Sequence, residues 1–431
     1  MRIEDIRREQ TLDRVRVAAT VRWEDCDRAT QDVYVEAPIQ FAPGVAASSD
    51  AFLVAGLLPA MRHGERRLAV SGEICPRLLI GLKDAMQLLS VWYGYSNPVT
   101  IESKNRVGSA LAATPSKRAA FFFTGGVDSL TTLRVNRRQF ADGDPEYFRD
   151  GLLICGLEVE QLDAFQYVVD GLTDLANESG VTLIPIYTNL RSLDDDWVFW
   201  ADQFESSVLA AVAHTLHGRL FSASIASSYD YGCLHPHGSH PLLDSNYSSA
   251  SLQIRHDGAG LSRLDKTRIL AEWERGVKSL RVCNRSDTYR PGLLNCGRCE
   301  KCLRTLTALM VLDKLDSAES FANREVTADV VQKSLEITPM NYPYWAELVG
   351  PLEAKGFSQL SQVIRTAIRY FETNGGWKEA VVRFDRQYLN GLLLRVRNSF
   401  SRTTASWSSA VLAELCLKDH VAMASSWLPS I

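Results

Sequence analysis

The residues best suited to bind an anion lie in one short stretch, Thr124–Ser129, with the sequence TGGVDS. An apolar run from Ala119 to Phe123 precedes it and predicts a buried strand, and the residues from Ser129 to Val135 predict the first turns of a helix. Paired glycines let the backbone bend sharply and bring its N–H groups close to a ligand, and the dipole of the following helix favours negative charge there. We therefore expect a phosphate or a pyrophosphate at this turn; the alternative is a glycine turn without a ligand.

The order of residues in this turn resembles the PP-loop of the ATP pyrophosphatases, which is Ser-Gly-Gly-x-Asp-Ser after a first strand. Thr124 takes the place of the first serine and keeps its hydroxyl group. A Walker loop carries Lys-Ser or Lys-Thr after its last glycine, and a dinucleotide fingerprint has a third glycine; this turn has neither. The resemblance implies that ATP binds here with Mg²⁺ and is cleaved between its α- and β-phosphates. The residues implied to bind it are Thr124, Gly125, Gly126, Val127, Asp128 and Ser129.

A second group of reactive residues is a cluster of cysteines. The chain has nine cysteines, and Cys296, Cys299 and Cys302 form two Cys-x-x-Cys spacings that share Cys299. Cys283 lies in a separate segment of the chain, with twelve residues between it and Cys296. Four thiolates within reach of one another suit a tetrahedral, structural Zn²⁺ ion. The alternative is a redox or sulfur-transfer pair made of Cys299 and Cys302.

The two motifs together resemble a narrower branch of the PP-loop enzymes, the 7-cyano-7-deazaguanine synthases of queuosine biosynthesis. The resemblance covers residues 119–305 and includes Lys266, near the start of a helix that we expect to follow Ser262. It implies a structural zinc ion beside the active site, and catalytic roles for Asp128 and Lys266. It also implies a reaction in which ATP and ammonia convert a carboxylate into an amide and then a nitrile. The stretch from His235 to Asp244 departs from that family near the substrate, so we expect a substrate particular to this chain.

The elements that must position these motifs follow from the apolar pattern. From about residue 116, apolar strands alternate with helices, which predicts an α/β fold with a parallel sheet flanked by helices, as in the Rossmann-like PP-loop ATPases. We expect an N-terminal α+β domain over residues 1–115, a PP-loop domain with the four-cysteine zinc site over residues 116–310, and a helical C-terminal region over residues 311–431. Ligands of such sheets bind beyond the carboxyl ends of the strands. Three further segments are expected at those ends: Gly156–Glu158, Thr188–Arg191 and Ser227–Asp230.

The composition of the chain argues against a nucleic-acid-binding protein and against a membrane protein. Hydrophobic residues make up 46% of the 431 residues, enough for substantial cores. The net charge of -4 gives no electrostatic sign of a nucleic-acid-binding protein. The first residues are charged throughout, and the apolar stretch from Ala51 to Met61 is too short to span a bilayer. We therefore expect a cytoplasmic protein that acts on a small molecule and does not contact a membrane.

These observations predict an ATP-dependent carbon-nitrogen ligase. The substrate carboxylate would attack the α-phosphorus of ATP, and ammonia or another amine would then take the acyl group from the adenylate. The sequence reveals no general base. Three alternatives stay open: sulfur transfer to tRNA through a persulfide on Cys155 or Cys233, RNA binding with a vestigial nucleotide site, and modification of a protein or peptide partner.

The stretch between Cys233 and Asp244 also carries His235, His237 and His240. Its prolines and glycines break any regular spacing, and the histidines fit no common metal-ligand template. We interpret it as a substrate-facing loop rather than a second metal site; a surface loop with incidental histidines is the alternative.

Overall fold

A computed structural model describes residues 1–96, 98–106 and 118–388 of the chain. Backbone packing divides the chain into two units, Met1–Ile368 and Arg369–Ile431. The sheet and every candidate residue named above lie in the first unit. Among the described residues, no helix is both long and apolar enough to cross a membrane.

One ten-stranded sheet organises the first unit, in the order β10-β9-β6-β7-β8-β3-β2-β1-β4-β5. Strands β10, β9, β6, β7 and β8 run parallel, as do β1, β4 and β5, whereas β3 and β2 pair antiparallel with their neighbours. The predicted α/β class with a largely parallel sheet is therefore confirmed. The strands are β1 (Arg2–Gln10), β2 (Arg14–Arg22), β3 (Gln31–Pro38), β4 (Arg67–Ile74), β5 (Thr100–Asn105), β6 (Arg118–Phe122), β7 (Phe148–Cys155), β8 (Thr182–Thr188), β9 (Leu220–Ala226) and β10 (Gln253–Asp257).

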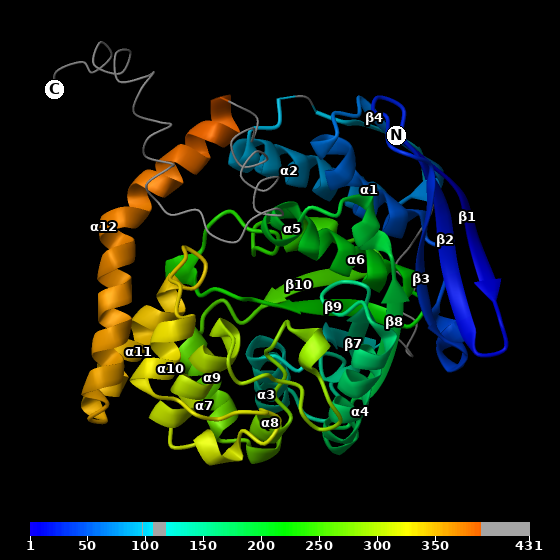
Figure 1. Ribbon diagram of the computed structural model, residues 1–431. Helices are drawn as coiled ribbons and strands as arrows, with labels where there is room; N and C mark the ends of the chain where they lie inside the picture. Colours follow the sequence, from blue (N-terminus) through cyan, green and yellow to red (C-terminus); the bar gives the residue numbers. More distant parts are fainter. Residues whose placement is uncertain (97, 107–117, 389–431) are drawn as a thin grey trace, which may run out of the picture. The chain divides into compact units, whose positions relative to one another are not determined.

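Helices cover both faces of this sheet (Figure 1), which leaves the central strands buried on each side and explains their continuous apolar sequences. One core lies between the sheet and α1, α2 and α6, and a second lies between the sheet and α3 and α4. The helices are α1 (Ser49–Arg62), α2 (Pro76–Tyr93), α3 (Val127–Gln139), α4 (Leu162–Glu178), α5 (Trp197–Phe199), α6 (Glu205–Thr215), α7 (Arg263–Ala271), α8 (Glu274–Lys278), α9 (Glu300–Val311), α10 (Ala328–Ser334), α11 (Tyr342–Ala354) and α12 (Ser358–Tyr388).

The N-terminal region contributes strands to the same sheet as the region that carries the glycine turn. Strand β3 pairs with β8, with Val35 opposite Thr188 and Glu36 opposite Tyr187. The boundary that we expect between residues 115 and 116 lies outside the described residues. The charged N-terminal residues, for which the sequence suggested no strand, form β1, where Arg7 pairs with Glu9 and Asp32.

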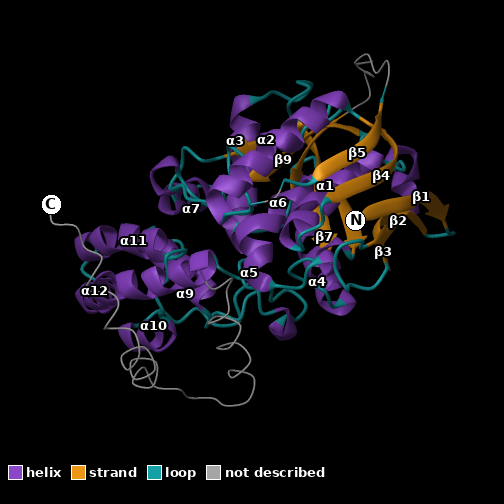
Figure 2. Cartoon of the chain, turned by 90° about the horizontal axis from the view of Figure 1, so that it is seen from above, coloured by secondary structure: helices purple, strands orange, loops and turns teal. Residues whose placement is uncertain are grey.

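The region after the cysteines is helical over its described residues. Seen from above, α9, α10 and α11 gather on the side away from β1, β2 and β3 (Figure 2). Trp345, Leu348 and Leu352 of α11 share a core with residues of α9 and the start of α12. Helix α12 is continuous from Ser358 to Tyr388, although the apolar pattern of the sequence predicts two helices, Leu360–Phe371 and Trp377–Leu394; the end of the second lies outside the described residues.

Candidate active site and metal centre

The TGGVDS stretch leads from β6 into α3, as its sequence predicts: Thr124, Gly125 and Gly126 form a tight turn, and Val127, Asp128 and Ser129 begin the helix. Gly126 is the N-cap residue of α3. The backbone N–H groups of the turn therefore lie at the N-terminus of the helix, beside the first N–H groups of the helix, which have no partner within it. The Thr124 hydroxyl accepts from the Gly126 N–H at 3.3 Å and donates to the Ser129 hydroxyl at 3.1 Å. The Ser129 hydroxyl in turn donates to the Gly126 carbonyl at 3.2 Å. The two hydroxyl groups of the motif therefore hold the shape of the turn.

Gly125 is required by the geometry of this turn. Its φ of +76° is one that residues with a side chain rarely adopt. A Cβ atom there would lie 3.0 Å from the side chain of Leu172 and 3.3 Å from Cβ of Arg281.

Arg281 holds the turn in place through hydrogen bonds, and the sequence analysis did not identify it. It lies in the segment that precedes the cysteines. Its backbone N–H donates to the Gly125 carbonyl at 2.8 Å, and its guanidinium donates to the Thr124 carbonyl at 3.1 Å. The same guanidinium donates to the Tyr289 hydroxyl at 3.0 Å, and that hydroxyl donates to the Cys283 carbonyl at 2.5 Å. A chain of hydrogen bonds thus links the glycine turn to the first cysteine of the cluster. No sequence motif marks Arg281.

Lys266 and Asp128, far apart in the sequence, lie together beside the turn. The Lys266 ammonium is 3.1 Å from Oδ1 of Asp128 and donates to the Ser227 carbonyl at 2.5 Å. The predicted N-cap, Ser262, is confirmed, because its hydroxyl accepts from the Asp265 N–H. Burial lowers the pKa of Lys266, whose side chain is 2% exposed, and the Asp128 carboxylate offsets part of that effect.

Arg263 is a second cation on Asp128 and was not singled out in the sequence. Its Nη2 atom lies 2.9 Å from Oδ2 of Asp128, so both carboxylate oxygens face a cation. Helices α3 and α7 are joined a second time where the Thr131 hydroxyl donates to the Lys266 carbonyl at 3.1 Å. These contacts hold the basic residues of α7 beside the start of α3.

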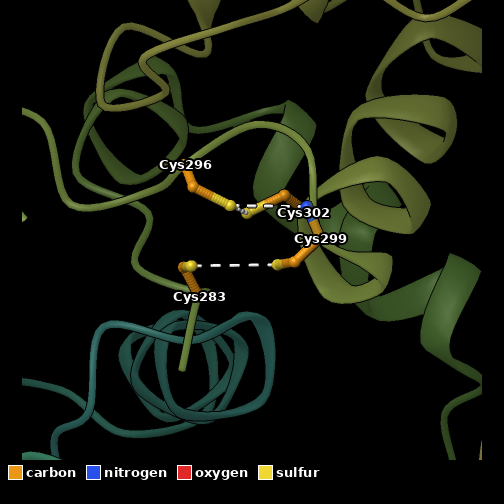
Figure 3. A group of neighbouring side chains, drawn as sticks. All are labelled: Cys283, Cys296, Cys299 and Cys302. Carbon is orange, nitrogen blue, oxygen red and sulfur yellow. Dashed lines mark hydrogen bonds between the residues drawn. The ribbon is translucent and has the colours of Figure 1, made fainter. Parts of the chain in front are cut away.

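The four predicted zinc ligands converge (Figure 3). Their sulfur atoms all lie within 4.8 Å of one another, and the Sγ–Sγ distances are 3.8 Å for Cys283–Cys299 and 3.9 Å for Cys296–Cys302. A tetrahedron of Zn–S bonds of about 2.3 Å has sulfur atoms about 3.8 Å apart, so the four thiols fit a structural zinc ion. The cluster could therefore hold a metal such as zinc.

The backbone around the cysteines is shaped for this geometry. Gly297 has a φ of +70°, and a Cβ atom there would lie 1.9 Å from the Asn323 carbonyl oxygen, so only glycine fits between Cys296 and Cys299. The buried Asn295 amide accepts from the N–H group of Cys283 at 3.1 Å and donates to the Leu280 carbonyl at 2.7 Å.

The histidine-rich stretch folds around a buried carboxylate. Asp244 accepts from the Ser239 hydroxyl at 2.8 Å and from the His240 N–H at 3.0 Å, and it lies 2.8 Å from Nδ1 of His256. His235 and His237 pack their rings edge-on against Tyr229. In the described part of the chain, the cysteine cluster is the one group of His, Cys, Asp or Glu side chains that comes close enough together to hold a metal ion.

Glu205 was also missed, and no motif in the surrounding sequence marks it. It starts α6 directly after a π-helical segment, Trp200–Phe204. Burial raises the pKa of this residue, and the nearby carboxylates of Glu158, Asp244 and Asp128 add to the effect while Lys301 opposes it, so that the pKa is about 8. Glu205 therefore lies close enough to Asp128 and Asp244 to sense both charges.

Comparisons of the chain with protein-family models, with curated proteins and with solved structures found no match.

Proposed function

We propose that this protein is an ATP-dependent ligase of the PP-loop type, which adenylates a substrate carboxylate and passes the acyl group to ammonia or another amine. The observation that carries the proposal is the Lys266–Asp128 pair, which lies beside a glycine turn that opens a helix. Backbone N–H groups, a helix N-terminus and a buried ammonium together favour the negative charge of a departing pyrophosphate.

The residues of the turn have separate roles in this proposal. The N–H groups of Gly125 and Val127 would bind the phosphates, while Thr124, which accepts from the Gly126 N–H, and Ser129 keep the turn in shape. Lys266 would stabilise the charge that develops as the bond between the α- and β-phosphates breaks. No described side chain is assigned as the base that deprotonates the amine.

Mg²⁺ bound with ATP would supply Lewis-acid stabilisation of the phosphates. Asp128 fits the role of a magnesium ligand poorly, because its two oxygens already lie 3.1 Å from Lys266 and 2.9 Å from Arg263. Its contacts support a role in aligning these two cations with the turn.

A zinc ion in the cysteine cluster would act at a distance. It would fix the segment that carries Cys283, and the contacts through Tyr289 and Arg281 would transmit that rigidity to Gly125. With four sulfur ligands the ion would keep no open position for a substrate, as in structural sites.

The contacts of the other cysteines count against sulfur transfer. Burial raises the pKa of Cys155 to about 11, and burial together with Asp230 raises the pKa of Cys233. A persulfide carrier needs a readily formed thiolate, which both environments disfavour.

The direct test is to measure AMP and pyrophosphate, against ADP and phosphate, released from ATP with ammonium and a panel of carboxylates that includes 7-carboxy-7-deazaguanine. We expect AMP from the wild type and little from Asp128→Ala. Asp195→Ala, which removes an exposed aspartate, is the matched control and should behave as the wild type. Release of ADP, or equal AMP from Asp128→Ala, would refute the proposal.

A further inference from the structure

The end of β10 carries a buried pair of a histidine and a carboxylate. Nδ1 of His256 lies 2.8 Å from Oδ2 of Asp244, and the two side chains are 4% and 0% exposed. Asp244 also accepts from the Ser239 hydroxyl at 2.8 Å and from the His240 N–H at 3.0 Å, which fixes its position. Because a carboxylate accepts, the imidazole of His256 carries its proton on Nδ1, and the lone pair of the neutral ring is on Nε2.

This Nε2 atom has nothing to bind. It is buried and has no hydrogen-bond partner among the residues that the structure describes. A buried acceptor without a partner costs about 1–3 kcal/mol, so native proteins rarely leave one unless a ligand or a bound water completes it. The free nitrogen of His256 therefore marks a place for a hydrogen-bond donor.

Ser239 supplies the third residue type of a hydrolase triad but not its geometry. In such a triad the serine hydroxyl binds Nε2, on the side of the ring away from the carboxylate. Here the Ser239 hydroxyl donates to Asp244 and lies 3.5 Å from Nδ1 of His256. The pair is thus arranged to accept a proton from a ligand at Nε2 and not to activate Ser239.

The backbone connects this pair to the candidate active site. The carbonyl of Asp257, the residue after His256, accepts from the Ser227 N–H at 2.7 Å. The Ser227 carbonyl in turn accepts from the Lys266 ammonium at 2.5 Å. A Cβ atom at Gly258 would lie 3.7 Å from Cε of Lys266. The end of β10 therefore lies close to Lys266.

The register of the sheet brings His256 level with the strand that leads into the glycine turn. His256 pairs with Ile225 of β9, and Ser224, the residue before Ile225, pairs with Phe121 of β6. Adjacent strands lie about 4.8 Å apart, so two strand spacings, about 10 Å, separate His256 from the end of β6. An acyl adenylate is long enough to reach both places.

The pair and the cations come to this edge of the sheet from opposite faces. Side chains alternate along a strand, so His256 lies on the same face as Ile254, which belongs to the core that the sheet shares with α6 (Figure 1). Lys266 and Asp128 come from α7 and α3, which contribute to the core on the other face. A ligand across the edge has the cations on one side and His256 on the other.

We propose that His256, positioned by Asp244, is the base that deprotonates the amine; this role rests on the proposed function. An ammonium ion has no lone pair and must lose a proton before it attacks. Nε2 of His256 takes that proton, and the Asp244 carboxylate stabilises the imidazolium. The freed lone pair of ammonia forms the C–N bond at the acyl carbon of the adenylate. The C–O bond to AMP breaks, its electron pair leaves with AMP, and the surplus proton on nitrogen passes to water.

The test measures the two halves of the reaction separately on the full chain at neutral pH, with the same panel of carboxylates. Exchange of labelled pyrophosphate into ATP reports adenylation, which needs no amine. AMP release with ammonium reports the whole reaction. AMP release with hydroxylamine reports acyl transfer without a base, because hydroxylamine is uncharged at neutral pH and is the stronger nucleophile.

We expect His256→Gln to lower AMP release with ammonium by about 10²-fold or more, the usual contribution of a general base. Pyrophosphate exchange and AMP release with hydroxylamine should stay close to the wild-type rates. A merely structural histidine would instead affect both nucleophiles alike. The matched control is His217→Gln, which removes a half-buried histidine before β9, at the amino end of the strand, and should behave as the wild type in all three assays.

Equal losses with ammonium and hydroxylamine, or no loss with either, in folded His256→Gln would overturn the role of His256 and leave the ligase standing. A wild type that shows neither exchange nor AMP release refutes the ligase, and the base with it. The melting temperature reports whether each variant is folded. If His256→Gln does not fold, Asp244→Asn decides the question, because it keeps the shape of the side chain and should show the same selective loss with ammonium.

Discussion

Replacing Lys266 by methionine should separate its chemical role from its structural one. Methionine fills a similar volume, so the change removes the ammonium without opening a large cavity. The lost contacts are those to Asp128 at 3.1 Å and to the Ser227 carbonyl at 2.5 Å. Hydrogen bonds to charged groups contribute about 1.5–3 kcal/mol each. Arg263 still pairs with Asp128, and the buried ammonium was itself costly, so we expect a net loss of about 1–3 kcal/mol in the free energy of unfolding.

Activity should fall much further than stability. Removing one donor aimed at developing charge costs about 10²–10³-fold in turnover. Release of AMP from ATP is the assay, run where urea titration shows the variant to be fully folded. Arg268→Met is the matched control, because Arg268 lies on the same helix with its side chain 53% exposed. The role of this ammonium would be refuted if folded Lys266→Met released AMP at a rate within about threefold of the wild-type rate, since the loss of such a donor should cost far more.

The same variant predicts a pH dependence. Because burial lowers the pKa of Lys266, the folded protein releases this proton at a lower pH than the unfolded chain does. The unfolded state therefore binds more protons as the pH approaches the ordinary lysine value of 10.5. Relative to Lys266→Met, the free energy of unfolding of the wild type should rise with pH in that alkaline range.

Three further predictions follow from the site. Cys302→Ser should lose the bound zinc, as measured by metal analysis, and should lower the melting temperature; stoichiometric zinc in this variant would contradict a four-thiol site. Gly125→Ala should destabilise the fold by about 1–2 kcal/mol, from the left-handed backbone alone, and should abolish AMP release. Gly143→Ala, with a φ of +107° but open space around it, is its control and should keep the activity. The pKa of Glu205 is about 8 in the folded protein, above the ordinary value of 4.5, so the folded state binds this proton more tightly than the unfolded state does. The contribution of this proton to the free energy of unfolding is therefore complete below pH 4.5 and should be lost as the pH rises through 8. Unfolding of Glu205→Gln, compared with the wild type across this range, should lack that decline.

Local sequence signals predicted the elements whose neighbours in the chain decide their structure. The helix expected after Ser262 begins there, with Ser262 as its cap. The glycine turn follows a buried strand and opens a helix, because its residues alone demand a sharp bend. Strand β1 was missed because its charged side chains pair with one another, as Arg7 does with Glu9, and with residues of β2 and β3, as Glu4 does with Arg22; a one-dimensional pattern does not record those contacts.

The sequence by itself determined the largely parallel α/β sheet, the turn at Thr124–Ser129 and the cysteine cluster, because each depends on residue types at short, fixed spacings. Only the tertiary structure decided which distant residues surround that turn. Arg281 reaches Gly125 and Thr124 from the segment before the cysteines, and Arg263 reaches Asp128 from α7; both contacts depend on how these segments pack at the carboxyl ends of the strands. Burial, ion pairing and pKa shifts arise from those long-range contacts, so no local pattern in the chain encodes them.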